Sequence, residues 1–162
     1  MIHFTPFFDI RYKEEEYSIA ALIPYIKYYV PDAKVVPLLL HGDLGIDGSV
    51  QLAREIGKAA GDRDWVIIGS VDFSHYLPPD SAGKMDDVTL QAIEPGDFEA
   101  LDRMGNDNLD SPPAVITVLE AVKETGADGL KVTGHSNSAA IAGKYNESTT
   151  SYFAMLFYDL TP

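Results

Sequence analysis

The feature that most constrains the fold is an apolar run, WVIIGSV, at positions 65–71. The run is nearly continuous and is bounded by turn-forming residues. A strand that is buried on both faces tolerates such a run, whereas a half-exposed strand alternates apolar and polar residues. The sequence therefore predicts that residues 65–71 form the innermost strand of a sheet.

The remaining periodic segments alternate between helices and strands. Helices are predicted at 18–30, 49–60, 84–93, 96–104 and 112–125, strands at 34–40, 129–135 and 151–159, and loops at 78–83 and 136–150. Pro24 is expected to kink the first helix or shift its start. This order favours an α/β fold with a mostly buried central sheet and helices on both faces. A length of 162 residues predicts a single domain, 1–162.

Charge and cysteine content exclude several classes of function. The chain has 12 Lys and Arg against 25 Asp and Glu, a net charge of −13, and no cysteine. Such a surface repels nucleic acid and anionic membranes, so neither is an expected partner. The absence of cysteine excludes thiolate metal sites and cysteine nucleophiles, and it fits a reducing cytoplasm. We find no bilayer-length apolar run and no signal peptide, so we expect a cytoplasmic protein.

The candidate catalytic residues are Asp72 and His75, which follow the apolar run. In open α/β sheets, sites form beyond the carboxyl ends of strands. A histidine there can bind a metal through one ring nitrogen while a carboxylate holds the other. The same pair can also serve as base and orienting group for a nucleophile, for which Ser70 and Ser74 are nearby. Alternatively, Asp72 caps a turn and His75 packs against its aromatic neighbours.

Two further histidines follow predicted strands. His41 and His135 would reach His75 if their strands ended at the same edge of the sheet. Three imidazoles from three strand ends would make a metal site. His75 is therefore the candidate metal ligand, with His41 or His135 as candidate additional ligands. The alternative is that each is an isolated surface or core histidine.

A series of short segments, in this order, resembles the Memo family, also called AmmeMemoRadiSam system protein B. The best match, SVDFSHY at 70–76, is similar to the family pattern S-S-D-[FL]-[ST]-H-[YW]. The resemblance covers roughly residues 14–159. The other matching pieces are EYSI at 16–19, LIPY at 22–25, VVPLL at 35–39, Asp87, Thr89-Leu90, Ile93, SNS at 136–138, Gly143 and SYFA at 151–154.

The resemblance implies a fold like that of class III extradiol dioxygenases, an α/β sandwich around a central sheet. It also implies a metal site that uses histidines from three motifs, of which only His75 is found here. The motifs P-H-A-G-Y and G-x-x-H, which lie in the family's N-terminal half, are missing. Tyr17 stands in place of the histidine of E-H-S-I, and residues 106–113, NDNLDSPP, lack the family's cysteine. The chain thus resembles only the family's C-terminal portion, as a fragment or as a shortened member.

These departures leave competing functions. The first is a non-catalytic binding or accessory module with a vestigial metal site. The second is a metal-dependent oxidoreductase or hydrolase of the non-haem iron type that uses His75, with a divalent metal such as iron as cofactor. A serine hydrolase is the weakest alternative, because no G-x-S-x-G elbow surrounds Ser70 or Ser74. If part of a Memo-like core is missing, exposed apolar surface favours a homo-oligomer or another protein partner.

Overall fold

A computed structural model describes residues 17–145 and 148–159. The chain divides into two compact units, residues 1–39 and 40–162. The described part of the first unit contains helix α1 (Tyr17–Ala20) and helix α2 (Ile23–Tyr29). The sequence predicted one helix here, and Pro24 lies in the first turn of α2, so it starts a new helix. The predicted strand at 34–40 is wrong, since these residues enter no sheet.

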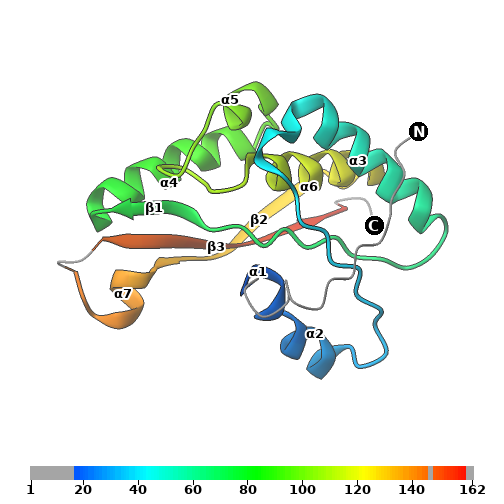
Figure 1. The fold of residues 1–162 in the computed structure, drawn as a ribbon, viewed down its shortest axis with the longest axis horizontal. Coiled ribbons are helices and arrows are strands. Elements are labelled where there is room, and N and C mark those ends of the chain that lie inside the picture. The colour runs from blue at the N-terminus through cyan, green and yellow to red at the C-terminus, as the bar shows by residue number, and fades with distance from the viewer. Residues whose placement is uncertain (1–16, 146–147, 160–162) are drawn as a thin grey trace. The chain divides into compact units, whose positions relative to one another are not determined.

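The second unit is a mixed α/β structure around a three-stranded antiparallel sheet (Figure 1). Strand β3 lies between β1 and β2, and it is therefore the central strand of the sheet. The elements in chain order are η2 (Gly42–Leu44), α3 (Gly45–Ala60), β1 (Phe73–Leu77), α4 (Pro79–Ile93), α5 (Phe98–Asp102), α6 (Pro112–Thr125), β2 (Gly129–Asn137), α7 (Ser138–Ala142) and β3 (Thr149–Tyr158).

Local signals in the sequence fix most of the helix ends. Helix α3 ends before Gly61 and α6 ends before Gly126, and both glycines have the positive φ that favours glycine after a helix. Helix α4 begins at Pro79, inside the predicted loop at 78–83, because proline is pre-organised for the first helical turn. The predicted loop at 136–150 contains the short helix α7.

The core of this unit lies between the sheet and its helices. Alternate β3 residues turn toward the helices, where Phe153, Met155 and Phe157 pack on the buried cluster. Phe73 of β1 makes an edge contact with Phe153, with ring centroids 4.8 Å apart. The buried cluster consists of Phe73, Ala92, Ile93, Leu101, Leu109, Val115, Ile116 and Leu119.

The predicted innermost strand at 65–71 is wrong. This segment is extended but belongs to no strand, and the sheet begins only at Phe73 (Figure 1). Trp65 and Ile67 are half-buried, whereas Val66 is 84% exposed and Ile68 is 56% exposed. An apolar run measures the tendency to be buried, but a strand also needs a neighbour for its backbone hydrogen bonds. Among the described residues, none pairs with this segment as a strand.

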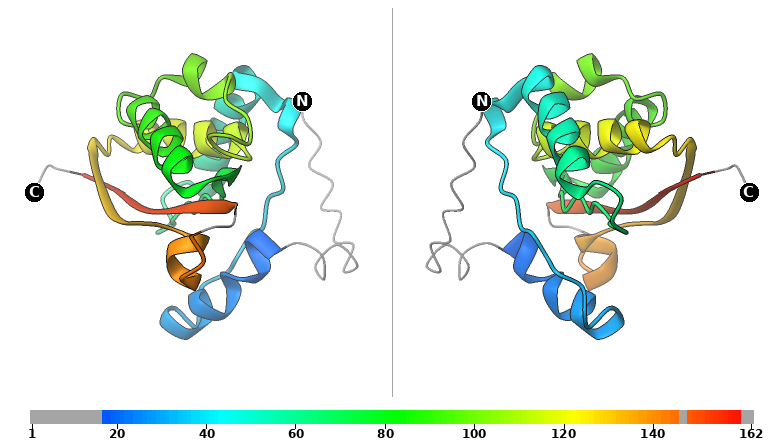
Figure 2. Two further views of the ribbon diagram at one scale, coloured as in Figure 1. Left: turned by 90° about the vertical axis from the view of Figure 1, so that its left-hand side faces the viewer. Right: turned by 90° about the vertical axis from the view of Figure 1, so that its right-hand side faces the viewer.

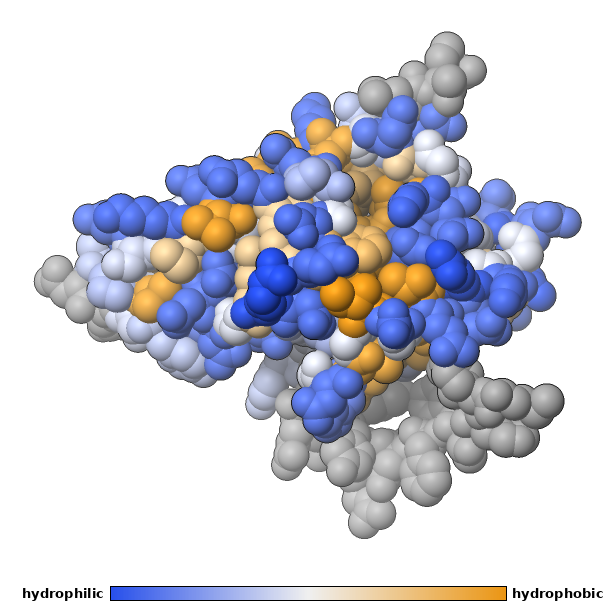
Figure 3. All heavy atoms as spheres, turned by 90° about the horizontal axis from the view of Figure 1, so that it is seen from above, coloured by the Kyte–Doolittle hydropathy of each residue, from blue (hydrophilic) through white to orange (hydrophobic). Residues whose placement is uncertain are grey.

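The helices are distributed unevenly over the sheet, in contrast to the predicted coverage of both faces. Within the described part of the second unit, helices α3 to α6 lie on one side of the sheet and α7 lies on the other (Figure 2). The outer surface of the α3–α6 layer is mainly hydrophilic, with hydrophobic side chains gathered near its middle (Figure 3). The other face of β3 leaves Leu156 and Tyr158 exposed. Within the described residues, no helix is both long and apolar enough for a membrane span.

Candidate metal site

Asp72 directly precedes β1 and His75 lies within it, so the pair does not lie beyond the carboxyl end of a strand as the sequence predicted. A third residue, Asp110, lies beside them. Asp110 belongs to the loop that joins α5 to α6. One potential ligand atom from each of the three side chains lies within 4.8 Å of the other two. Among the described residues, this group alone brings three or more potential metal ligands together in this way.

Backbone hydrogen bonds hold the Asp110 loop against β1. The amide of Ser74 donates to the carbonyl of Asn108 (2.8 Å), and the amide of Asp110 donates to the carbonyl of Asp72 (3.0 Å). Leu109 forms a bridge with Phe73 and is fully buried in the core. The loop therefore acts as a short additional strand, and the core fixes the position of its aspartate.

The neighbours of His75 determine how its imidazole is presented. Its Nδ1 lies 3.2 Å from the Thr150 hydroxyl oxygen on β3, and its Nε2 lies 3.7 Å from Asp72 Oδ2. A partner on one ring nitrogen fixes the ring orientation and leaves the other nitrogen for a ligand. The pairing of β1 with β3 is irregular on both sides of His75, and Tyr76 has a φ of 59°. Such irregularities redirect side chains and are concentrated next to functional sites.

The site concentrates negative charge. Asp110 also accepts a hydrogen bond from the Asp72 amide (3.2 Å). Asp110 is an exposed residue, but its carboxyl group is partly desolvated. This desolvation, and next the Asp72 carboxylate, raise the pKa of Asp110, which the charge of His75 and backbone hydrogen bonds partly oppose. Burial and the Asp72 charge likewise raise the pKa of Tyr152. Two carboxylates and one imidazole are a ligand set that suits divalent cations such as Fe(II) and Mn(II).

The raised pKa of Asp110 predicts a stability effect in the metal-free protein. A raised folded-state pKa means that the folded protein holds this proton more tightly, so stability falls as pH rises from the ordinary aspartate range through the folded pKa. Asp110→Asn, which keeps an acceptor oxygen for the Asp72 amide, is therefore expected to raise the melting temperature at pH 7 in EDTA. The gain should shrink toward pH 4. Thermal unfolding at both pH values tests this prediction, and Asp107→Asn, at an exposed residue of the same loop, is the control. A melting temperature of Asp110→Asn below that of the unmodified protein at pH 7 would contradict it.

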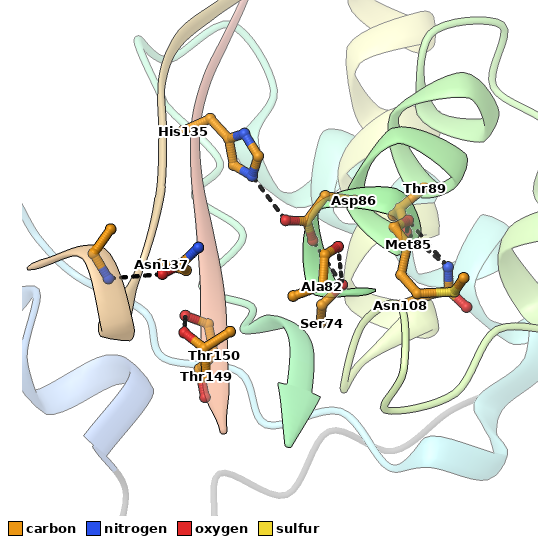
Figure 4. A network of polar contacts seen from close by, with 11 residues as sticks. Ser74, Ala82, Met85, Asp86, Thr89, Asn108, His135, Asn137, Thr149 and Thr150 are labelled. Carbon is orange, nitrogen blue, oxygen red and sulfur yellow. Dashed lines mark hydrogen bonds and ion pairs between the residues drawn. The ribbon is translucent and has the colours of Figure 1, made fainter. Parts of the chain in front are cut away.

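His135 lies outside this cluster, and its imidazole, which is 39% exposed, contacts a separate network around the buried Asp86 (Figure 4). Its Nε2 lies 2.8 Å from Asp86 Oδ2, and its ring stacks on Phe153 with centroids 4.1 Å apart. Asp86, which is 1% exposed, also accepts a hydrogen bond of 2.7 Å from the Ser74 hydroxyl. The carboxylate lies between the serine and the histidine, so the order of a catalytic triad is absent.

The other candidates from the sequence have different surroundings. Ser74 is fully buried and donates to Asp86, so it is not presented to a substrate beside His75. His41 is exposed, and its Nδ1 accepts a hydrogen bond from the Asp43 amide at the start of η2. Neither His41 nor His135 belongs to the three-residue cluster.

Asp110, Thr150 and Tyr152 also belong to this region, although the sequence did not predict them as site residues. The one signal near Asp110 is the segment 106–113, which stands where the Memo family has a cysteine. Thr150 and Tyr152 are far from His75 in sequence and reach the site only because β3 pairs with β1. No local sequence pattern predicts such a contact.

The fold and the cluster define a mixed α/β protein with a candidate divalent-metal site. A family model described as Memo-like protein matches residues 2–156, and the chain belongs to this family. It is 30% identical over 163 residues to a MEMO1 family protein of Pyrobaculum aerophilum, which covers 96% of this chain and 57% of that protein. The identity to a MEMO1 family protein of Methanopyrus kandleri is 29% over 160 residues, which covers 92% of this chain and 54% of that protein. The chain thus spans a little over half the length of these relatives.

Proposed function

We propose that this chain is a divalent-metal-binding module of the Memo family. The observation that carries the proposal is the convergence of Asp72, His75 and Asp110, whose ligand atoms lie within 4.8 Å of one another. These residues come from two segments of the chain, and a buried leucine and backbone hydrogen bonds hold the segments together. They would supply three ligands to one face of the metal, and binding should be weaker than at a closed site with four protein ligands.

As a metal-binding module, the chain would have a binding or accessory role in the cytoplasm, without nucleic acid or membrane as a partner. The net charge of −13 supports this reading, because it disfavours phosphate backbones and anionic lipids and attracts cations. Asp72 is 48% exposed at its side chain and His75 is 13% exposed, so a cation can reach the cluster from solvent.

A metal-dependent oxidoreductase or hydrolase is the second candidate. Three protein ligands leave coordination positions for water and a substrate, as catalytic metal sites require. Tyr152, a phenol whose pKa the nearby Asp72 charge helps to raise, is a group that could contact such a substrate. Water-proton relaxation of the Mn(II)-loaded protein separates the two candidate functions. An enzyme of this kind needs exchangeable water on the metal, so a metal shielded from water would contradict the enzyme candidate.

The metal proposal is tested by titrating Mn(II) into protein in chelator-treated buffer and following free Mn(II) by electron paramagnetic resonance. We expect one bound ion per chain for the unmodified protein. Asp110→Asn is expected to weaken binding by about 100-fold, since a ligand should matter at least as much as a residue that only orients one. Asp107→Asn, on the same loop and exposed, is the matched control. Absence of Mn(II) binding, or equal affinities of the two variants, would overturn the proposal.

A further inference from the structure

Helix α4 carries buried polar side chains on the face that meets strand β1 (Figure 4). Asp86 is 1% exposed, and Thr89, one turn further along the helix, is fully buried. A buried polar group is costly unless it is hydrogen-bonded, and a buried carboxylate is the most costly of all. The hydrogen-bond partners of these side chains therefore show which segments of the chain the helix holds.

Asp86 binds β1 at the residue that directly precedes the candidate ligand His75. Its Oδ1 accepts a hydrogen bond of 2.7 Å from the hydroxyl of the fully buried Ser74. Its Oδ2 lies 2.8 Å from Nε2 of His135, so each carboxylate oxygen has a partner. Because Ser74 and His75 are neighbours in the chain, this anchor restricts the backbone from which the His75 imidazole projects.

Strand β1 needs such an anchor because its pairing with β3 is irregular. The register shifts on both sides of His75, so the ladder alone does not set the orientation of the strand there. The next residue, Tyr76, has a φ of 59°, which is unfavourable for a residue with a side chain. Backbone strain of this kind persists only where surrounding contacts hold it. The hydrogen bond between Ser74 and Asp86 is a buried contact two residues from that strain.

The same helix also holds the second segment of the cluster, the loop that carries Asp110. Asn108 lies two residues before Asp110, and its side-chain amide donates to the Met85 carbonyl oxygen at 3.2 Å and to the Thr89 hydroxyl oxygen at 3.1 Å. Residues three or four apart share one face of a helix. One face of α4 therefore anchors both segments that supply candidate ligands (Figure 4).

We propose that Asp86 is a positioning residue of the metal site, and that it acts on His75 through the Ser74 hydroxyl. This inference rests on the proposed metal binding by Asp72, His75 and Asp110. Ligands bind a metal well only when their supporting contacts hold them within about 0.5 Å of the required geometry. His135 completes the anchor, because it gives the second oxygen of the buried carboxylate a partner and compensates the cost of its burial.

Ser74→Ala removes the link between Asp86 and β1 and is tested by Mn(II) titration of the whole chain. We expect the affinity to fall by about tenfold, the lower end of the range for residues that orient a metal ligand. Ser49→Ala is the matched control, since Ser49 is also fully buried and its hydroxyl donates at 2.7 Å, to the Gly45 carbonyl oxygen in α3. Equal affinities of the two variants would overturn the proposal.

Two substitutions of Asp86 separate its hydrogen bond from its charge. Asp86→Asn keeps an acceptor oxygen for Ser74 and should retain the Mn(II) affinity of the unmodified protein. Asp86→Leu removes both acceptors and should bind as weakly as Ser74→Ala, and the double variant should bind no more weakly than either, because the two residues act as one unit. Asp86→Leu should still fold, since Ser74 also lies 3.3 Å from the Ala82 carbonyl oxygen and His135 is partly exposed to water. Loss of affinity in Asp86→Asn, or additive losses in the double variant, would overturn the proposal.

The imidazole of His75 gives a second readout that requires no metal. In the metal-free protein, nuclear magnetic resonance of the imidazole nitrogens reports which nitrogen carries the proton, and His75→Ala assigns the signals. We expect Ser74→Ala and Asp86→Leu to shift the His75 signals toward those of an unconstrained histidine, and Ser49→Ala and Asp86→Asn to leave them in place. Unchanged His75 signals in Asp86→Leu would overturn the positioning role. If the unmodified protein binds no Mn(II), the proposed function fails, whereas the positioning of His75 is still decided by these spectra.

Discussion

His75→Ala is expected to reduce Mn(II) or Fe(II) affinity by at least about 100-fold, the largest effect that we predict on binding. His75 supplies the one nitrogen ligand in the cluster, and Thr150 holds its other ring nitrogen at 3.2 Å. Loss of a residue that only orients a metal ligand typically lowers metal affinity by about 10- to 100-fold. Loss of the ligand itself should lower the affinity by at least as much. Titration calorimetry under anaerobic conditions gives the affinities directly.

His41→Ala provides the matched histidine control. His41 is exposed, and its imidazole contacts the neighbouring Asp43 and lies outside the cluster, so its loss should leave the affinity unchanged. Comparing His75→Ala with His41→Ala distinguishes a metal site at the Asp72, His75 and Asp110 cluster from the three-histidine site that the sequence also allowed. Stoichiometric binding that survives His75→Ala, or that is lost with His41→Ala, would contradict the assignment.

Leu109→Ala is expected to destabilise the protein by about 2–5 kcal/mol, the usual cost of deleting a fully buried leucine side chain. Leu109 has no exposed surface and pairs with Phe73, and it adjoins Asp110 in the loop that completes the site. The same substitution should therefore weaken metal binding, because it loosens the loop that presents Asp110. Urea unfolding measures the first effect and Mn(II) titration measures the second.

Two controls distinguish packing from a general sensitivity to substitution. Leu109→Met preserves the volume and should cost less than about 1.5 kcal/mol. Val88→Ala removes methyl groups from a residue that is 47% exposed on α4, and its effect should stay within about 0.5 kcal/mol. Full stability of Leu109→Ala would mean that the loop is not anchored in the core.

The sequence was most informative where the signal is local. Helices α3 and α6 end where Gly61 and Gly126 predicted, because a glycine after the last turn accommodates positive φ without strain. The predicted strand at 151–159 corresponds to β3. The pattern at 70–76 indicated the Memo family, which the family model confirms, and it singled out Asp72 and His75. Their role as metal ligands stays a prediction.

Only the tertiary structure decided which distant residues meet. Asp110 joins the cluster because its loop bonds to β1, and His135 binds Asp86 instead because β2 and α4 bring them together. Segment 65–71 has the composition of a buried strand but lies outside the sheet, since composition specifies burial and not a partner for the backbone. Helix ends depend on neighbours within a few residues, whereas strand pairing and site assembly depend on contacts between residues far apart in the chain.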